Sequence, residues 1–209
     1  MMKAACSGRR FVLGALLFTL FSAFELRAAE VASLNDEGDG SLRQLVADAV
    51  AGQTITFSQA GTITLTSPIT IDKDIVIDGG DLVTISGGGL TSIFKIISGN
   101  VEIKNITLRD GLAKGGAGGV PGSYAGGGQQ GGGGGGAGFG GAIAIRDGSV
   151  KIEGVTFIGN QSVGGNGGRA SYPVYDRNGY SGRGGSSWFG NGGGSSYGDG
   201  KNGGLGGGG

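Results

Sequence analysis

The 209-residue chain contains no histidine and a single cysteine. Without histidine it lacks the side chain that most often serves as a general base near neutral pH. The one cysteine, Cys6, lies close to the N-terminus, so the rest of the chain has no thiol for a disulfide or for a cysteine metal motif. These absences exclude the disulfide-rich scaffolds and the familiar cysteine metal sites.

An excess of positive charge is also missing. The chain has 16 basic and 16 acidic residues, and residues 1–29 contain four of the basic and one of the acidic residues. The remainder therefore carries three more acidic than basic side chains. Nucleic-acid-binding domains present a basic face, so the charge balance argues against a nucleic-acid partner.

The N-terminus has the pattern of an export signal. Three basic residues among the first ten precede an uninterrupted apolar run from Phe11 to Phe24, and a short segment ending in Ala28 and Ala29 follows. A membrane anchor is the alternative, but this run has 14 residues and a bilayer span needs about 20. We therefore predict a signal peptide at 1–29, cleaved after Ala28 or Ala29, and a secreted or cell-surface (outer-membrane) location.

A short helix is predicted within an N-terminal cap at 30–53. In "GDGSLRQLVADAVAG", the apolar residues recur at the spacing of one helical face. Ser41 and Gln44 have the spacing of a capping box, and Gly52 is placed to end the helix. The apolar face consists of Leu42, Leu45, Val46, Ala49 and Val50.

Asp36, Glu37 and Asp39 precede this helix and raise the possibility of a calcium loop. An EF-hand beginning at Asn35 would place Val46 where the bidentate glutamate must stand. An acidic turn at the positive end of a helix explains the cluster better.

From residue 54 onward, the hydrophobic period changes from that of a helix to that of a strand. Apolar–polar–apolar triplets rich in β-branched residues alternate with Gly- and Asp-rich turns, which is typical of short half-buried strands. Either a β-sandwich or a parallel β-helix has this pattern. The triplets are Ile63–Leu65, Ile69–Ile71, Ile75–Ile77, Val83–Ile85, Val101–Ile103 and Ile106–Leu108.

An internal repeat favours the β-helix. "VEIKNITLRDG" (101–111) aligns with "VKIEGVTFIGN" (150–160) at an offset of 49 residues, and the glycine tract 113–140 supplies 28 of these. The remaining 21 residues are about one β-helix coil, so the two segments should stack in a parallel sheet. In this register Glu102 faces Lys151, and Lys104 faces Glu153. Opposite-charge pairs of this kind help to set register.

Glycine divides the rest of the chain. Of the 53 glycines, 12 precede residue 111 and 41 lie in 111–209. We predict β-helix coils at 54–111 and 140–163 and an ejected Gly-rich loop at 112–139. Residues 164–209 are expected to be a low-complexity tail, truncated or disordered, because they have little to bury. The tail is read as solvated, or alternatively as an adhesive surface built from Tyr172, Tyr175, Tyr180, Trp188, Phe189 and Tyr197.

Two short motifs carry a family resemblance. "GGAI" (140–143) followed by "FIGN" (157–160) resembles the paired repeats of polymorphic outer-membrane proteins and related bacterial autotransporter passengers. "DEGDGSLRQLVADAVAGQTITF" (36–57) is similar to the leader of many large bacterial β-helix surface proteins. The resemblance implies an all-β, right-handed parallel β-helix, like that of pectin lyases, at the cell surface.

The resemblance also implies structural roles for four residues. Gly140 and Gly141 would form a tight turn, Phe157 would point into the core, and Asn160 would occupy a turn that tolerates left-handed geometry. Autotransporters end in a membrane barrel, and no segment of this sequence matches one. Membrane association is therefore expected only through export or through such a barrel, missing from this sequence.

Enzymes also use parallel β-helices, so a carbohydrate-active lyase or hydrolase is the main alternative function. The densest carboxylates, Asp72, Asp74, Asp78 and Asp81, sit in predicted turns, where aspartate is common for its own backbone hydrogen bonds. A calcium-stabilised structural protein is a third possibility.

We expect a surface scaffold that presents Gly-rich loops, with no catalytic activity and no catalytic, cofactor or metal residues. Substrate-binding residues are unknown. A receptor or glycan on a host or neighbouring cell is the expected partner.

Overall fold

The computed structural model describes residues 28–120 and 132–169. It also describes the backbone of 125–127, of 174–176 and of four residue pairs between 186 and 200. Of the predicted signal peptide, only Ala28 and Ala29 fall within the described part. Most of the predicted tail, including the side chains of its aromatic residues, lies outside it.

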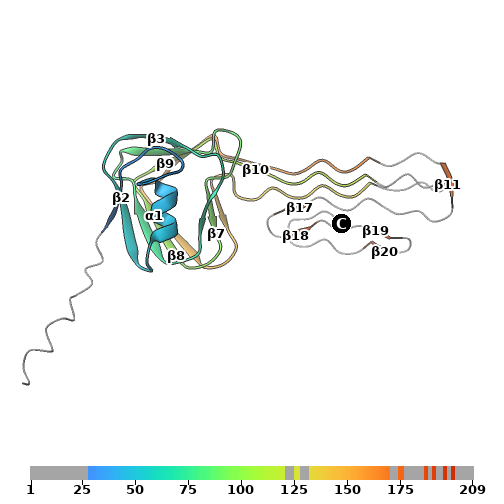
Figure 1. Cartoon of the computed structure of the whole chain (residues 1–209). Helices are drawn as coiled ribbons and strands as arrows, with labels where there is room; N and C mark the ends of the chain where they lie inside the picture. The colour runs from blue at the N-terminus through green and yellow to red at the C-terminus, as the bar shows by residue number, and fades with distance from the viewer. Residues whose placement is uncertain are drawn as a thin grey trace, which may run out of the picture.

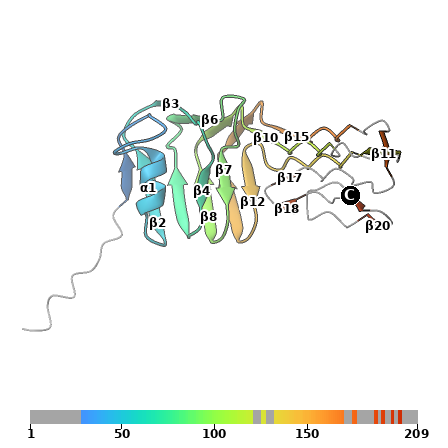
Figure 2. The same ribbon diagram turned by 45° about the vertical axis from the view of Figure 1, so that its right-hand side comes forward.

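The described chain is all-β, with parallel sheets and one short helix. It visits three sheets in rotation, and we call each passage through the three a circuit (Figures 1 and 2). The first sheet has the order β1 (Ala29–Val31), β2 (Gln53–Phe57), β5 (Ile75–Asp78), β8 (Asn100–Lys104) and β13 (Ser149–Glu153). The second contains β3 (Gly61–Thr64), β6 (Val83–Ser86), β9 (Thr107–Arg109) and β14 (Thr156–Ile158). The third contains β4 (Ile69–Ile71), β7 (Phe94–Ile96) and β12 (Ile143–Ile145).

Shorter strands lie beyond these three sheets. β10 (Leu112–Lys114) pairs in parallel with β15 (Gln161–Val163), and β11 (Ala125–Gly127) pairs in parallel with β16 (Val174–Asp176). Two antiparallel pairs follow, namely β17 (Ser186–Ser187) with β18 (Gly190–Asn191), and β19 (Ser195–Ser196) with β20 (Asp199–Gly200).

Strands one circuit apart pair in register, and this confirms the alignment of 101–111 with 150–160. Val101 pairs with Val150 and Ile103 with Ile152 on the first sheet, and Leu108 pairs with Phe157 on the second. All three pairs have the predicted offset of 49 residues.

Both predicted charge pairs stand opposite each other in this register, but only one of them forms an ion pair. Lys151 Nζ lies 2.9 Å from Glu102 Oε1, as the alignment predicts. Lys104 is in register with Glu153, yet the charged groups of these two residues make other contacts. Lys104 Nζ lies 3.7 Å from Asp78 Oδ2, because Asp78 stands opposite Lys104 on the other neighbouring strand, and Glu153 lies 3.4 Å from Lys151.

The inward-facing residues of the sheets form one hydrophobic core. β-Branched side chains fit the half-buried face of a strand, and each large side chain buried here contributes about 1.5–3 kcal/mol. All six predicted triplets supply core residues. These are Ile63, Leu65, Ile69, Ile71, Ile75, Ile77, Val83, Ile85, Val101, Ile103, Ile106 and Leu108, each at most 3% exposed.

A helix packs against one end of this core. α1 (Leu42–Asp48) is capped by Ser41, whose hydroxyl accepts the Gln44 backbone amide at 3.3 Å, as predicted. The reciprocal capping contact does not form, because the Gln44 side chain donates to Asp48 instead. Leu42 and Val46 are buried, but Val50, expected on the same face, is 44% exposed because the helix has ended before it. No helix among the described residues has the length and hydrophobicity to cross a bilayer.

The residues of the GGAI and FIGN motifs agree only in part with their expected roles. Gly140 has a φ of +64°, the left-handed conformation of a tight turn. Phe157 is in register with buried Leu108 but remains 48% exposed, because β14 is the edge strand of its sheet. At the turn after β14 it is Gly159 that is left-handed, with a φ of +62°. The Asn160 side chain instead accepts the Gly111 amide and donates to the Leu108 carbonyl.

The Glu102–Lys151 pair offers a test of the register. Glu102→Lys should lower the thermal midpoint through repulsion with Lys151, and adding Lys151→Glu should recover part of that loss. The effect should be small because the pair is solvated. Urea or thermal unfolding of both single variants and the double variant measures the coupling. Strictly additive effects would contradict direct contact between these side chains.

Candidate functional site

The four aspartates considered as ligands or catalytic groups are divided between the two ends of β5. Asp72 and Asp74 precede this strand, and Asp78 and Asp81 lie at and beyond its end. Asp74 Oδ1 accepts the Asn100 amide at 2.7 Å, and Asp81 has a left-handed φ of 59°. Among the described residues no group of three or more acidic, histidine or cysteine side chains could hold a metal ion. Asp74 and Asp81 thus contribute to the turns on either side of β5.

Asp78 binds the turn that joins the first sheet to the second. Its carboxylate accepts the Gly80 amide at 3.1 Å and the Asn105 side-chain amide at 3.0 Å. Burial raises the pKa of Asp78, but these hydrogen bonds and nearby Lys104 outweigh it, so the pKa lies below its usual value. Asp81, Asn105 and Gly154 occupy this corner in successive circuits, each with a left-handed φ. Asp, Asn and Gly are the residues that tolerate this conformation.

Asp36 fastens the cap to the sheets rather than binding an ion. Its carboxylate accepts hydrogen bonds from the Arg43 guanidinium on α1 and from the amide and hydroxyl of Thr66, which follows β3. Burial raises the pKa of Asp36, but the bonds from Thr66 and Arg43 together lower it further. Sequence reasoning placed this residue in an acidic turn and missed its partner, because Thr66 lies 30 residues away.

An open hollow of about 300 Å³ lies where the circuits meet the glycine-rich segments. It offers one carboxylate, Asp110, which already accepts a hydrogen bond from Arg109 Nε at 2.7 Å. Its other lining residues are Leu112, Gln161 and four glycines, Gly88, Gly89, Gly111 and Gly159.

Three glycine-rich segments project from the circuits beside this hollow, after the strands of the second sheet, and form what we call the glycine bundle. They are residues 112–120, which leave the third circuit, residues 132–139, which return to it, and residues 161–169, which leave the fourth (Figure 1). β10 and β15 set the register at the base, where Leu112 pairs with Gln161. The tract expected as an ejected loop therefore includes two of the three bundle segments, which residues 121–131 join.

Outside the β10–β15 ladder, each bundle segment donates hydrogen bonds to one neighbour and accepts them from the other. The first donates to the third, the third to the second, and the second to the first. Six bonds of this kind are 2.7–3.0 Å long, and their donors recur every three residues. The donors are Gly115 and Gly118, then Gly133 and Gly136, then Gly165 and Gly168. Three residues per turn is the period of a polyproline II helix.

The same period determines where a side chain fits. A Cβ added at any of seven bundle glycines would lie less than 3.0 Å from a backbone carbonyl oxygen of a neighbouring segment. The segments would therefore have to separate. These glycines are Gly115, Gly118, Gly132, Gly135, Gly138, Gly165 and Gly168. At Gly164 and Gly167 the nearest atom is 3.8 Å away, which is ordinary contact.

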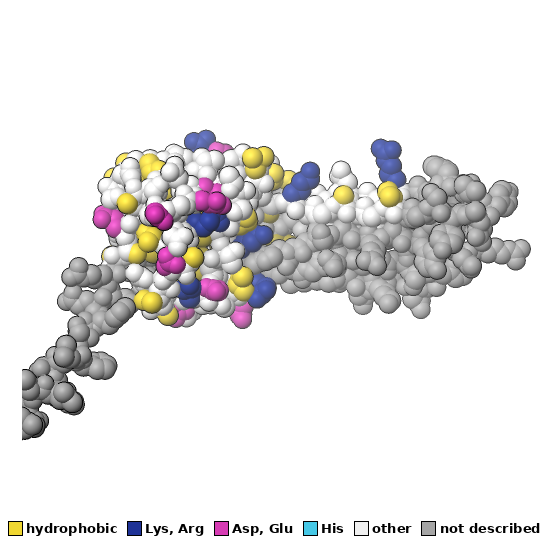
Figure 3. Space-filling view, in the orientation of Figure 1, with side chains coloured by type: hydrophobic (Ala, Val, Ile, Leu, Met, Phe, Trp, Pro, Cys, Tyr) yellow, Lys and Arg dark blue, Asp and Glu magenta, His cyan; other side chains and the backbone are white. Residues whose placement is uncertain are grey.

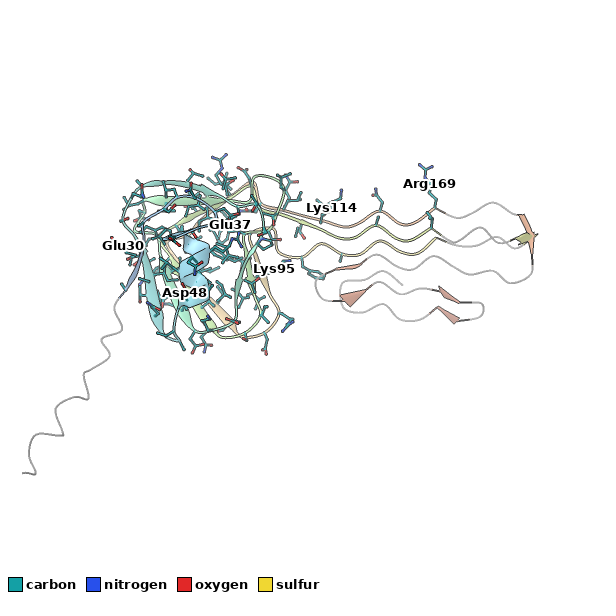
Figure 4. All side chains as sticks on the ribbon, viewed as in Figure 1. Glu30, Glu37, Asp48, Lys95, Lys114 and Arg169 are labelled. Carbon is teal, nitrogen blue, oxygen red and sulfur yellow. The ribbon has the colours of Figure 1, made fainter. Side chains whose placement is uncertain are left out.

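The surface of the bundle differs from that of the circuits. In Figure 3 its described part is mostly white, since glycine offers only backbone, whereas charges of both signs are interspersed over this side of the circuits. Lys114 near its base and Arg169 at its outer end point away from the strands (Figure 4). Backbone atoms thus make up most of the described bundle surface on this side (Figure 3).

Comparison of the chain with protein family models, with curated proteins and with solved structures found no match.

The hydrogen bonds to Asp36 predict an acid-sensitive cap. A carboxylate whose pKa is lower when folded binds fewer protons than in the unfolded chain. Its stabilisation is therefore complete above the unfolded value, about 4, and is lost as the pH falls through the folded pKa. Asp36→Asn should lower the unfolding free energy at pH 7 by about 1–3 kcal/mol and flatten its decline below pH 4. Urea unfolding from pH 2 to pH 7 measures both, and curves parallel to wild type would contradict this role.

The packing of the bundle predicts different effects for alanine substitution at two adjacent glycines. Gly165→Ala should push its segment away from the Gly116 carbonyl and raise amide exchange at Gly118 and Gly168 about tenfold, the effect of losing bonds worth about 1 kcal/mol each. Gly164→Ala, the matched control, should leave exchange unchanged because its Cβ has room. Hydrogen-exchange mass spectrometry distinguishes them, and equal effects would show that the three-residue period does not govern packing.

Proposed function

We propose that this protein is an exported surface scaffold of the autotransporter-passenger type. In this proposal its circuits form a right-handed parallel β-helix that displays the glycine bundle, without catalytic activity. The glycine bundle carries the proposal, because it is a hydrogen-bonded arm held away from the core and directed outward. A receptor or glycan on a host or neighbouring cell is the kind of partner that such an arm would meet.

Three features support the right-handed β-helix. The chain visits the sheets in rotation, strands one circuit apart pair in parallel, and inward residues stack on one another. Crossover connections between parallel strands are right-handed in nearly all proteins. The left-handed residues at the corners permit the chain to turn within a few residues.

Two features support export and display. The basic and apolar N-terminus has the pattern of a signal peptide, and the GGAI and FIGN motifs resemble those of surface passengers. The aspartates that might have served an enzyme are engaged in turns, so the proposal assigns them to structure.

The position of β1 predicts the cleavage site. β1 begins at Ala29, which pairs with Ile55, so cleavage after Ala28 keeps the whole strand, whereas cleavage after Ala29 removes its first residue. We expect the exported protein to begin at Ala29, as measured by mass spectrometry of the intact chain. Retention of Met1 would contradict export.

Display is tested separately with an epitope inserted between Gln129 and Gln130, in the connection between the outgoing and returning bundle segments. Antibody should label intact cells that express the tagged full chain. A matched version that lacks residues 1–28 should be labelled only after lysis. Equal labelling of the two versions on intact cells, or labelling of neither, would contradict display.

A further inference from the structure

The last described strand of each of the three sheets leaves an inward-facing apolar side chain open to solvent. Ile145, Ile152 and Phe157 are 44%, 46% and 48% exposed. Their partners one circuit earlier, Ile96, Ile103 and Leu108, are fully buried. The three strands that carry the exposed residues, β12, β13 and β14, each stand at the edge of a sheet among the described strands. We call this surface the open face.

Open apolar edges of this kind mark an interaction surface, because a strand edge pairs readily with another strand. The opposite end of the circuits is closed by α1, which buries Leu42 and Val46 against the core (Figure 2). A second copy of this chain could therefore not cover the open face with its α1 end. It would have to present its own open face, which makes the contact two-fold symmetric.

Charge supports that arrangement. Lys151 and Glu153 flank Ile152 on β13. If two β13 strands run antiparallel with the two Ile152 residues opposite each other, Lys151 of each copy faces Glu153 of the other. Both cross-strand pairs are then attractive. A two-fold axis that passes between the two Ile152 residues also brings β14 of one copy toward β12 of the other. Phe157 of one copy then meets Ile145 of the other.

We propose that two copies of this chain associate through their open faces, with β13 paired antiparallel to its own copy about Ile152. The association extends the first sheet across the dimer and covers the apolar side chains that each copy leaves exposed. It concerns the opposite side of the circuits from α1, and it does not depend on export or on the function of the glycine bundle.

A charge-swap experiment tests this pairing with the chain that begins at Ala29. Glu153→Lys places lysine opposite lysine, and Lys151→Glu places glutamate opposite glutamate. Each reversal converts two attractive pairs into two repulsive ones, so we expect each single variant to dimerise about tenfold more weakly or worse. An equimolar mixture of the two variants should recover dimers, because the two lysines that flank Ile152 in one variant face the two glutamates that flank it in the other.

Sedimentation equilibrium over a concentration series measures the dissociation constants. Glu37→Lys makes the same charge change beside α1 and should leave dimerisation unchanged. Because Lys151→Glu also loses the contact with Glu102, Lys151→Gln replaces it in the mixture if its circular dichroism shows unfolding.

Two outcomes would overturn the proposal. The first is a wild-type chain that stays monomeric, and the second is a pair of single variants that dimerise as wild type does. In the first case, dimerisation of a chain shortened to end at Arg169 would assign the open face to residues 170–209 of the same chain.

Discussion

Parallel backbone pairing between strands one circuit apart is the constraint on which the rest of this structure depends. Because paired strands keep the same alternation, the inward position of one circuit lies over the inward position of the next, as in Ile77, Ile103 and Ile152. A slip of one residue would turn every side chain to the opposite face. The pairing also fixes the positions of the turns between the sheets. It therefore limits where an inserted segment can leave a circuit and where it must return.

The glycine bundle shows how that limit is met. Residues 112–120 leave the circuit and residues 132–139 return beside them, because Gly136 donates to the Gly116 carbonyl and Gly133 to the Gly119 carbonyl. The two ends of the insertion are thus held together by their own backbone. Closure of a long loop costs little more than closure of a short one, and here the segments at each end are also hydrogen-bonded. The third circuit consequently continues at Ala142 and Ile143 as if uninterrupted.

Much of the fold could be predicted from sequence because its signals are local or repeated. Alternating apolar residues gave the strands and the core, and the 49-residue repeat gave the register that places Glu102 beside Lys151. The bundle could not be found in this way. Where almost every residue is glycine, a three-residue period is hidden, and the steric need for it at Gly118 arises from carbonyls in other segments. Asp36 was missed for a related reason, since its partner, Thr66, is distant in the sequence.

The circuits and the bundle are stabilised by different means, and this makes one depend on the other. The circuits bury large side chains, which supply most of the free energy of folding. The bundle buries almost none, and ordering glycine costs more conformational entropy than ordering any other residue. Its backbone hydrogen bonds contribute about 1 kcal/mol each, too little to assemble three free glycine segments. The folded circuits supply the rest of the free energy that assembly needs, because they hold β10 and β15 side by side and in register. The bundle therefore depends on the register that the sheets impose at its base. Loss of the last circuit should allow the bundle segments to separate.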